Sequence, residues 1–251
     1  MSGHSKWASI KHQKGVADAR RGQLFTKLTR EIIVTVRESG SNPDINVKLR
    51  LAIQKARDNN MPLENIERAI KRGSGELEGA TLVEMVLEGY GPGGSAILVE
   101  ALSDNRNRTL QEIRNIFSRS SGSLGEIGCV AWLFDPKGLI IVETNELDTE
   151  ELALQAIDAG ADDVNVEDDH VEIYTKTEEL ETVRAALEQE NIPIASAELS
   201  MVPKTTLQLD EKAALQALKL LHKLEELDEI RGVYSNVDFP TSVLEKYQEQ
   251  A

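Results

Sequence analysis

The segment from residue 138 to residue 203 has an order of expected elements that few folds accommodate. Its apolar pattern predicts strands at 139–143, 163–166, 171–174 and 194–202, and helices at 150–159 and 178–190. Strand, helix, strand, strand, helix, strand is the order of a ferredoxin-like unit. We therefore expect a self-contained α/β sandwich here, with an acidic hairpin between its second and third strands.

The sequence on both sides of this unit predicts the two halves of another sandwich. The elements expected are strands at 82–90 and 95–102, a helix over 110–117, a strand at 130–134, a helix at 210–224 and a strand at 231–237. The last helix and strand have no partners of their own, and they complete the earlier half. The ferredoxin-like unit is thus expected as an insertion, with residues 135–138 as its linker.

Residues 1–76 are expected to be helical. Apolar residues recur at helical spacing between residues 17 and 37, then after Pro43 and Pro62, which suit the first turn of a helix, and Gly73 and Gly75 end the third run. The expected apolar faces are Leu24, Phe25, Leu28, Ile32 and Val36; Ile45, Leu49, Ile53 and Ala56; and Leu63, Ile66 and Ile70. The fold class is therefore α+β, with three domains. They are a helical domain at 1–76, a discontinuous ferredoxin-like sandwich at 77–134 and 205–251, and the inserted sandwich at 135–204.

The composition excludes several classes of protein. No apolar run approaches the ~18–20 residues of a membrane-spanning helix, and the basic N-terminus lacks the apolar stretch of a secretory signal. A single cysteine, Cys129, excludes a disulfide framework and a Cys-pair zinc site, which suits a reducing compartment. We expect a cytoplasmic protein that does not bind membranes.

The net charge of −15 is distributed unevenly along the chain. Residues 1–75 contain 15 Lys and Arg against 7 Asp and Glu, whereas residues 76–251 contain 13 against 36. A basic segment joined to an acidic body is typical of proteins that contact a polyanion with one part, although each surface could simply stay soluble. Because the basic excess falls in one expected domain, we interpret that domain as nucleic-acid-binding.

Basic side chains in this domain fall on one side of an expected helix. On a helical projection, Lys27, Arg30 and Arg37 lie within about 100° of Arg20, opposite the apolar face. A basic arm precedes the helix, and cations along such a surface bind phosphates by displacing counterions. Trp7 could stack on a base, but an isolated aromatic more often packs, so we expect it to anchor the arm. The candidate binding residues are His4, Lys6, Trp7, Lys11, His12, Lys14, Arg20, Arg21, Lys27, Arg30 and Arg37.

Two connections have distinctive sequences. The glycine-rich turn at 90–94 joins two strands and lacks the Gly-Lys-Ser/Thr end of a P-loop, so we expect a hairpin turn that uses positive φ. In the connection after the second strand, Asp104 or Asn105 could cap the following helix. Capping does not require Arg106 and Arg108, so their contact with a phosphate or carboxylate remains an equal alternative.

The sequence contains no recognisable catalytic arrangement. The four histidines include no His-x-x-x-His pair, and no Gly-x-Ser-x-Gly elbow occurs. Cys129 is expected at the start of an apolar strand, as a buried and unreactive thiol. The acidic stretch from Asp162 to His170 lacks the spacing of a calcium loop and is expected to be a solvated hairpin tip. We therefore expect a protein that is not an enzyme and uses no cofactor and no metal.

Several of these stretches are also similar to a known family. They are Gly3 to Trp7, Phe25 to Lys27, Glu88 to Gly94 and Ser103 to Thr109. Through them the chain resembles the YebC/PmpR family, whose members are usually described as probable transcriptional regulatory proteins. The family also includes a mitochondrial translational activator of cytochrome c oxidase subunit I. The motifs are specific in the first ~130 residues and diffuse beyond them. The resemblance implies a helical N-terminal domain and two α/β domains, one inserted in the other.

The resemblance implies nucleic-acid binding in one of two settings. Our first hypothesis, the family's prevailing description, is a regulator that binds promoter DNA. The alternative is a ribosome-associated translation factor that contacts ribosomal RNA and eases synthesis of proline-rich sequences, with its acidic domains facing basic proteins. The residues alone do not distinguish the two, because no dimeric helix-turn-helix and no base-reading set is recognisable. Gln13, Gly15 and Gln23 depart from the family pattern, and the two missing charges predict weaker phosphate binding by the arm.

Overall fold

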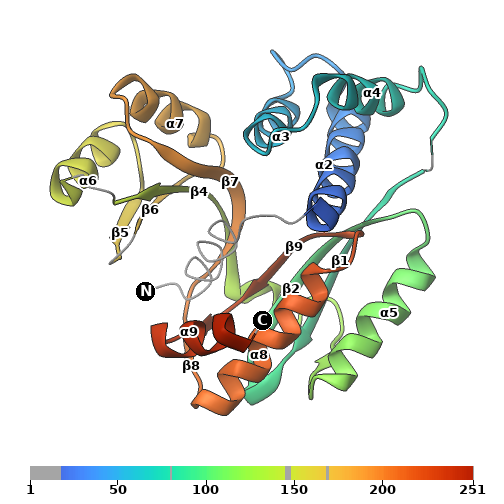
Figure 1. Ribbon diagram of the computed structural model, residues 1–251, viewed down its shortest axis with the longest axis vertical. Coiled ribbons are helices and arrows are strands. Elements are labelled where there is room, and N and C mark those ends of the chain that lie inside the picture. Colours follow the sequence, from blue (N-terminus) through green and yellow to red (C-terminus); the bar gives the residue numbers. More distant parts are fainter. Residues whose placement is uncertain (1–17, 80, 145–147, 168–169, 251) are drawn as a thin grey trace. The chain divides into compact units, whose positions relative to one another are not determined.

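The computed structural model describes residues 18–79, 81–144, 148–167 and 170–250, and Figure 1 shows their mixed α+β architecture. Residue contacts divide them into two compact units. The first contains residues 18–131, Leu209–Ser235 and residues 247–250, and the second contains Trp132–Gln208 and Asn236–Lys246. The helices and antiparallel sheets confirm the predicted fold class. Among the helices in these ranges, none is long and apolar enough to cross a membrane.

Three helices open the first unit, as predicted. They are α2 (Asp18–Ser39), α3 (Val47–Asp58) and α4 (Leu63–Gly73). Their apolar faces share one core, in which Leu28 and Leu49 are almost fully buried. Leu63, expected on the apolar face of the third helix, is instead exposed at the start of α4. At the end of α4, a Cβ on Gly73 would lie 2.7 Å from the Cβ of Val36, so only glycine allows α4 to approach α2 this closely.

The start of α3 differs from the prediction. Ile45, expected on the apolar face, is 79% exposed, and Pro43 lies in a turn ahead of the helix. The buried residue is Asn46, whose side-chain oxygen accepts from the N–H of Leu49 at 3.0 Å. Its amide donates to the backbone oxygen of Gly40 at 2.8 Å. Because this N-cap is tied to the end of α2, the helix begins two residues later than the apolar pattern suggests.

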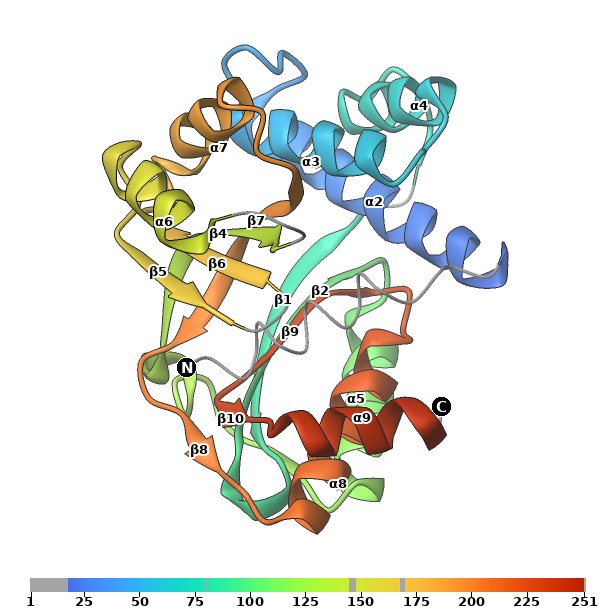
Figure 2. The ribbon, with the colours of Figure 1, turned by 60° about the vertical axis from the view of Figure 1, so that its left-hand side comes forward.

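The first unit also contains a four-stranded antiparallel sheet in the order β3-β1-β2-β9. Its elements are β1 (Val83–Tyr90), β2 (Ala96–Ser103), α5 (Arg106–Arg119), β3 (Ser123–Leu124), α8 (Glu211–Glu225) and β9 (Ile230–Ser235). Helices α5 and α8 lie together on one face of this sheet (Figure 2). The turn between β1 and β2 holds the short helix η1 (Pro92–Gly94), with positive φ at Gly93 and Gly94, which confirms the expected glycine turn.

The strand expected at 130–134 is wrong. The sheet's fourth strand is β3, which pairs with residues 89–90, and the short helix η2 (Ala131–Leu133) follows further along the chain. The buried carboxylate of Glu88 explains the difference. It accepts the N–H groups of Gly128, Val130 and Ala131 at 2.6–2.7 Å, so these donors are satisfied by a side chain rather than by a neighbouring strand.

The second unit has the predicted ferredoxin-like arrangement. Its elements are β4 (Phe134–Glu143), α6 (Thr149–Asp158), β5 (Asp163–Val166), β6 (His170–Thr175), α7 (Leu180–Gln189) and β7 (Ile194–Pro203). The strand order is β5-β6-β4-β7, and all neighbours are antiparallel. In sequence order this is 2-3-1-4, the order of a ferredoxin-like sheet.

Residues 135–138 are not a linker. They belong to β4 and pair with residues 199–202 of β7. Pairing of β4 with β6 begins only at Gly138, so Pro136 lies where one side of the strand has no neighbour within this sheet. A proline, which has no N–H to donate, is tolerated at such a position.

The C-terminal part contains elements that the sequence patterns do not predict. Strands β8 (Leu207–Gln208) and β10 (Val237–Asp238) form a two-stranded parallel pair, and α9 (Thr241–Gln250) follows. The expected boundaries of three separate domains remain a prediction.

Candidate nucleic-acid interface

The basic arm of the prediction cannot be placed. His4, Lys6, Trp7, Lys11, His12 and Lys14 lie outside the described residues, as does the side chain of Arg20. Arg21 and Arg37 are exposed at the two ends of α2. The candidate surface must therefore be built from α2 onward.

Two of the candidate binding residues on the basic side of α2, Lys27 and Arg30, make polar contacts within the first unit. The Lys27 ammonium donates to the backbone oxygen of Glu225 at the end of α8. The Arg30 guanidinium donates to the backbone oxygen of Leu102 at 3.2 Å and lies 3.7 Å from the carboxylate of Glu229. The Arg30 side chain is only 19% exposed. Both cations hold α2 against the sheet and helices of the first unit, which their helical spacing alone could not reveal.

A second ion pair reinforces this contact. The guanidinium of Arg231, on β9, lies 3.5 Å from the carboxylate of Glu31 on α2. Burial opposes the charge of Arg231, but nearby Glu31 and Glu100 outweigh it, and the pKa of Arg231 is raised. Helix α2 is therefore joined to the rest of its unit by both a basic residue, Arg30, and an acidic one, Glu31.

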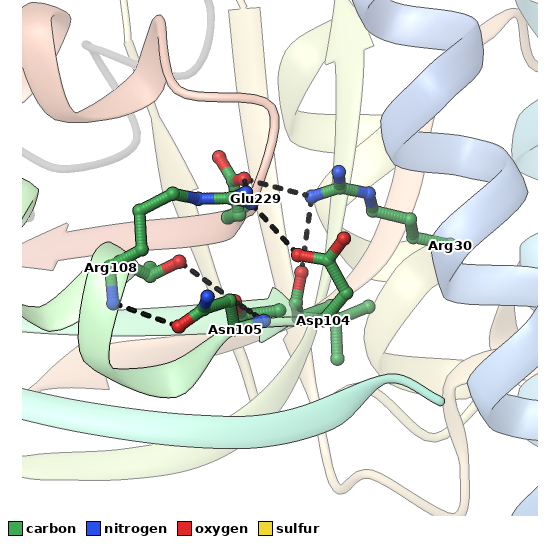
Figure 3. A network of polar contacts seen from close by, with 8 residues as sticks. Arg30, Asp104, Asn105, Arg108 and Glu229 are labelled. Atoms are coloured by element: carbon green, nitrogen blue, oxygen red, sulfur yellow. Dashed lines mark hydrogen bonds and ion pairs between the residues drawn. The ribbon is translucent and has the colours of Figure 1, made fainter. Parts of the chain in front are cut away.

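The connection between β2 and α5 is organised by a network of polar contacts (Figure 3). Asn105 is the N-cap of α5, because its side chain accepts from the N–H of Arg108 at 3.1 Å. The guanidinium of Arg108 donates to Asp104 at 2.8 Å and to Glu229 at 2.9 Å. The hydrogen bond to Glu229, together with the charge of Asp104, raises the pKa of Arg108. The structure thus supports capping by Asn105 and pairs Arg108 with internal carboxylates.

Arg106 is arranged differently from Arg108. It is exposed in the first turn of α5 and makes no ion pair or hydrogen bond with any described residue. Of the two arginines singled out in this connection, Arg106 is the one whose charge is available to an external anion.

Sequence reasoning missed other available cations. Arg57 and Lys71 are exposed and Arg72 is half-buried, and none of the three is paired within the described ranges. Arg114 and Arg119, on α5, are exposed and likewise make no ion pair with any described residue. A helical projection of residues 63–73 would have identified Arg72, because it places Arg68 and Arg72 on one side of α4, away from the apolar stripe.

The remaining candidates are the acidic hairpin and Cys129. Within the described parts of the chain, no group of three or more acidic, His or Cys side chains could hold a metal ion. Glu172, in the hairpin region, is fully buried and receives hydrogen bonds from Tyr174 and Asn165 at 2.7 and 2.9 Å. Cys129 lies in a turn rather than at the start of a strand, and burial and then the charge of Glu88 raise its pKa. A raised pKa disfavours the reactive thiolate.

Comparison with known proteins gives matches along most of the chain. The family model described as the TACO1/YebC protein N-terminal domain matches residues 5–76. The family model described as the TACO1/YebC second and third domain matches residues 82–237. Two proteins of Dehalococcoides mccartyi, each named a probable transcriptional regulatory protein, are 61% and 60% identical over 251 residues, which is 100% of both chains in each pair. One from Halothermothrix orenii with the same name is 51% identical over 253 residues, again 100% of both chains.

A solved structure agrees with these matches. The crystal structure of a conserved hypothetical protein from Aquifex aeolicus superposes with a TM-score of 0.86 at 49% identity, covering 94% of this chain and 97% of that one. Similarity at this level, over both the helical and the α/β parts, confirms the resemblance found in the motifs. The chain belongs to the TACO1/YebC family.

Proposed function

We propose that this protein is a nucleic-acid-binding regulator that contacts DNA through the basic side chains of its first unit. One observation carries the proposal: Arg57, Lys71, Arg72 and Arg106 have no internal partner among the described residues. Their charge is left available to an external anion. The names of the relatives, probable transcriptional regulatory proteins, support a regulatory role for that binding.

The chemistry of this binding is mainly electrostatic. Unpaired guanidinium and ammonium groups contact phosphates and release condensed counterions, which makes the affinity fall with salt. The exposed cations Arg21 and Arg37 and the basic residues of the first 14 positions extend the proposed surface. Lys27, Arg30 and Arg108 serve the fold instead. The protein acts in the cytoplasm, without catalysing a reaction.

A second candidate, a ribosome-associated translation factor, is favoured by the charge of the second unit. Residues 134–204 contain 4 Lys and Arg against 19 Asp and Glu. Such a surface is repelled by a bare duplex, whereas on a ribosome it would face basic ribosomal proteins while the first unit contacts ribosomal RNA. Folded RNA can be bound through its shape and backbone without a helix that reads a groove.

Competition binding at fixed, near-physiological salt separates the two candidates. The competitors are a candidate promoter duplex, a scrambled duplex of the same length and purified ribosomes. A DNA-directed regulator should prefer the promoter over the scramble by ~10³-fold or more. Equal binding of the two duplexes, with tighter binding to ribosomes, would instead identify the translation factor. Binding to none of the three would refute both candidates.

A further inference from the structure

A groove of about 400 Å³ lies between α2 and α4 in the first unit. Its apolar part is formed by side chains that also contact the helical core, among them Phe25, Met61 and Leu82. This volume is within the ~300–1,000 Å³ of typical small-ligand sites. The groove is therefore large enough to hold one planar ring system against an apolar wall.

Polar groups without internal partners surround this apolar part. The side chains of Thr29 and Asn65 are half-buried and form no hydrogen bond with any described residue. Together they offer donors and acceptors beside the apolar wall. Half-buried polar groups of this kind are ready to bind a ligand that presents its own donors and acceptors.

Positive charge lies along the same rim. Arg68 and Arg72 line the groove from α4; Arg68 is paired with Glu64 on the same helix, whereas Arg72 has no ion-pair partner in the described ranges. The aliphatic part of Arg72 lies alongside Gly79, where an added Cβ would be 3.8 Å from its side-chain carbons. The one acidic lining residue, Asp104, is already paired with Arg108 (Figure 3). Arg72 is thus the lining cation whose charge is available to an anionic ligand.

We propose that this groove binds a single unpaired nucleotide of a nucleic-acid strand. The base packs against Phe25 and the apolar wall, Asn65 and Thr29 hydrogen-bond to the base edge, and Arg68 and Arg72 contact the adjacent phosphates. This inference rests on the proposed function and specifies the form of nucleic acid that the protein recognises. Aromatic side chains that stack on extruded bases, next to groups that bind the base edge, are the usual means of recognising single-stranded segments.

A fully paired duplex cannot occupy the site in this way, because its bases are stacked and their edges paired inside the helix. It can contact only the cations on the rim. The groove therefore predicts that a strand with unpaired bases binds more tightly than a duplex of the same sequence.

Fluorescence anisotropy with the full-length protein tests this inference. The probes are a labelled 12-nucleotide single-stranded RNA of mixed sequence and the same RNA as a duplex. Asn65→Ala removes no charge, so a loss of single-strand affinity cannot be an electrostatic effect. We expect Asn65→Ala and Arg72→Gln each to weaken single-strand binding about tenfold, because each removes a hydrogen bond to the strand. Asn65→Ala should change duplex binding less than about twofold.

Lys71→Gln is the matched control for Arg72→Gln. It removes one unpaired charge from the same helix, but Lys71 does not line the groove. Lys71→Gln should therefore lower the affinity for both RNA probes equally and only slightly. Circular dichroism and urea unfolding of each variant check that the fold is retained.

The outcomes separate this inference from the proposed function. If the wild-type protein binds both probes equally and Asn65→Ala changes neither, the groove has another occupant, such as a peptide segment, and the inference is overturned. If the wild-type protein binds DNA but neither RNA probe, the inference is overturned and the proposed function stands. If it binds neither probe nor any DNA, both are overturned. Photocrosslinking of a 4-thiouridine-containing strand to residues 61–72 would support the groove directly.

Discussion

Glu88 fixes the backbone of residues 128–131 with a single side chain. Its burial opposes ionisation, but hydrogen bonds from the N–H groups of Gly128, Val130 and Ala131 outweigh this effect, and the pKa of Glu88 lies below its ordinary value of 4.5. A carboxylate whose pKa is lowered by folding stabilises the fold at pH values above the unfolded pKa. That contribution is lost as the pH falls through the folded pKa.

Glu88→Gln should therefore destabilise the protein at neutral pH by about 2 kcal/mol, because an amide oxygen is a weaker acceptor and the new NH₂ group faces backbone donors. The difference in unfolding free energy between wild type and variant should be largest at pH 7 and shrink below pH 4.5. Urea unfolding at pH 7 and pH 3 measures it. Glu126→Gln, in an exposed position nearby, is the control and should change stability little at either pH. If the difference in unfolding free energy between wild type and variant were the same at pH 7 and pH 3, the stabilising role of the ionised Glu88 carboxylate would be contradicted.

Arg30 and Arg57 illustrate how cations of the same type serve different purposes. Arg30→Gln should lower the unfolding free energy by about 1–2 kcal/mol, because its bonds to Leu102 and Glu229 are lost. Arg57→Gln should leave stability within about 0.5 kcal/mol. It should instead reduce the salt dependence of nucleic-acid binding, with a slope lower by about 0.7–0.9. Urea unfolding and anisotropy titrations at several salt concentrations check both variants, and an unchanged slope for Arg57→Gln would remove this residue from the interface.

These residues also mark the limit of sequence reasoning at this scale. Helical spacing predicted Lys27 and Arg30 on the side of α2 opposite the apolar face. It could not show that β2, the end of α8 and the connection to β9 lie against that side, where residues 102, 225 and 229 contact the two cations. Likewise, nothing in the local sequence indicates that Glu88 binds a turn 40 residues away. Both contacts depend on tertiary structure.

At the scale of elements, prediction was more successful, because periodicity determines which face of a helix or strand is buried. The order of strands and helices in the inserted unit follows directly from it. One error, at 130–134, comes from the distant carboxylate of Glu88, and another occurred where the pattern contains Pro and Gly. Residues 135–138 have the composition of a turn, yet they form one end of β4 because β7 pairs with them on one side. The elements α9, β8 and β10 are too short or too weakly periodic to be recognised.

Gly138, in β4, lies close to the start of α7. A Cβ there would lie 2.2 Å from the hydroxyl oxygen of Thr175 and 2.9 Å from the Cβ of Leu180. Gly138→Ala should therefore lower the unfolding free energy by about 1–3 kcal/mol through overpacking. Gly22→Ala, in α2, has no atom within 4 Å of the new Cβ and should raise it by about 0.5–1 kcal/mol. The thermal and urea unfolding midpoints of the two variants should shift in opposite directions relative to the wild type. If Gly138→Ala left the unfolding free energy unchanged, α7 would have to be able to shift away from β4.

At the scale of the whole molecule, charge is divided between parts of the chain. Residues 1–75 carry a basic excess, and the inserted segment 134–204 carries the greatest part of the acidic excess. Separation of this kind gives one chain a part that attracts polyanions and a part that repels them. The total charge of −15 conceals this arrangement, which is why the distribution along the chain was more informative than the sum.

The division predicts that the segment 134–204 is an independent unit without affinity for nucleic acid. It contains all four strands of one sheet and both helices packed on it, α6 and α7, whose buried residues include Leu152 and Val183. Expressed alone, it should give a cooperative urea transition and the circular dichroism of a mixed α/β fold. It should not bind DNA or RNA at concentrations at which the full-length chain is saturated, because its charge repels phosphates. Anisotropy with the same probes, and the full-length protein as the positive control, makes the comparison. If the folded fragment bound as tightly as the full chain, the interface would have to be sought in the acidic unit, and the basic first unit would lose its proposed role.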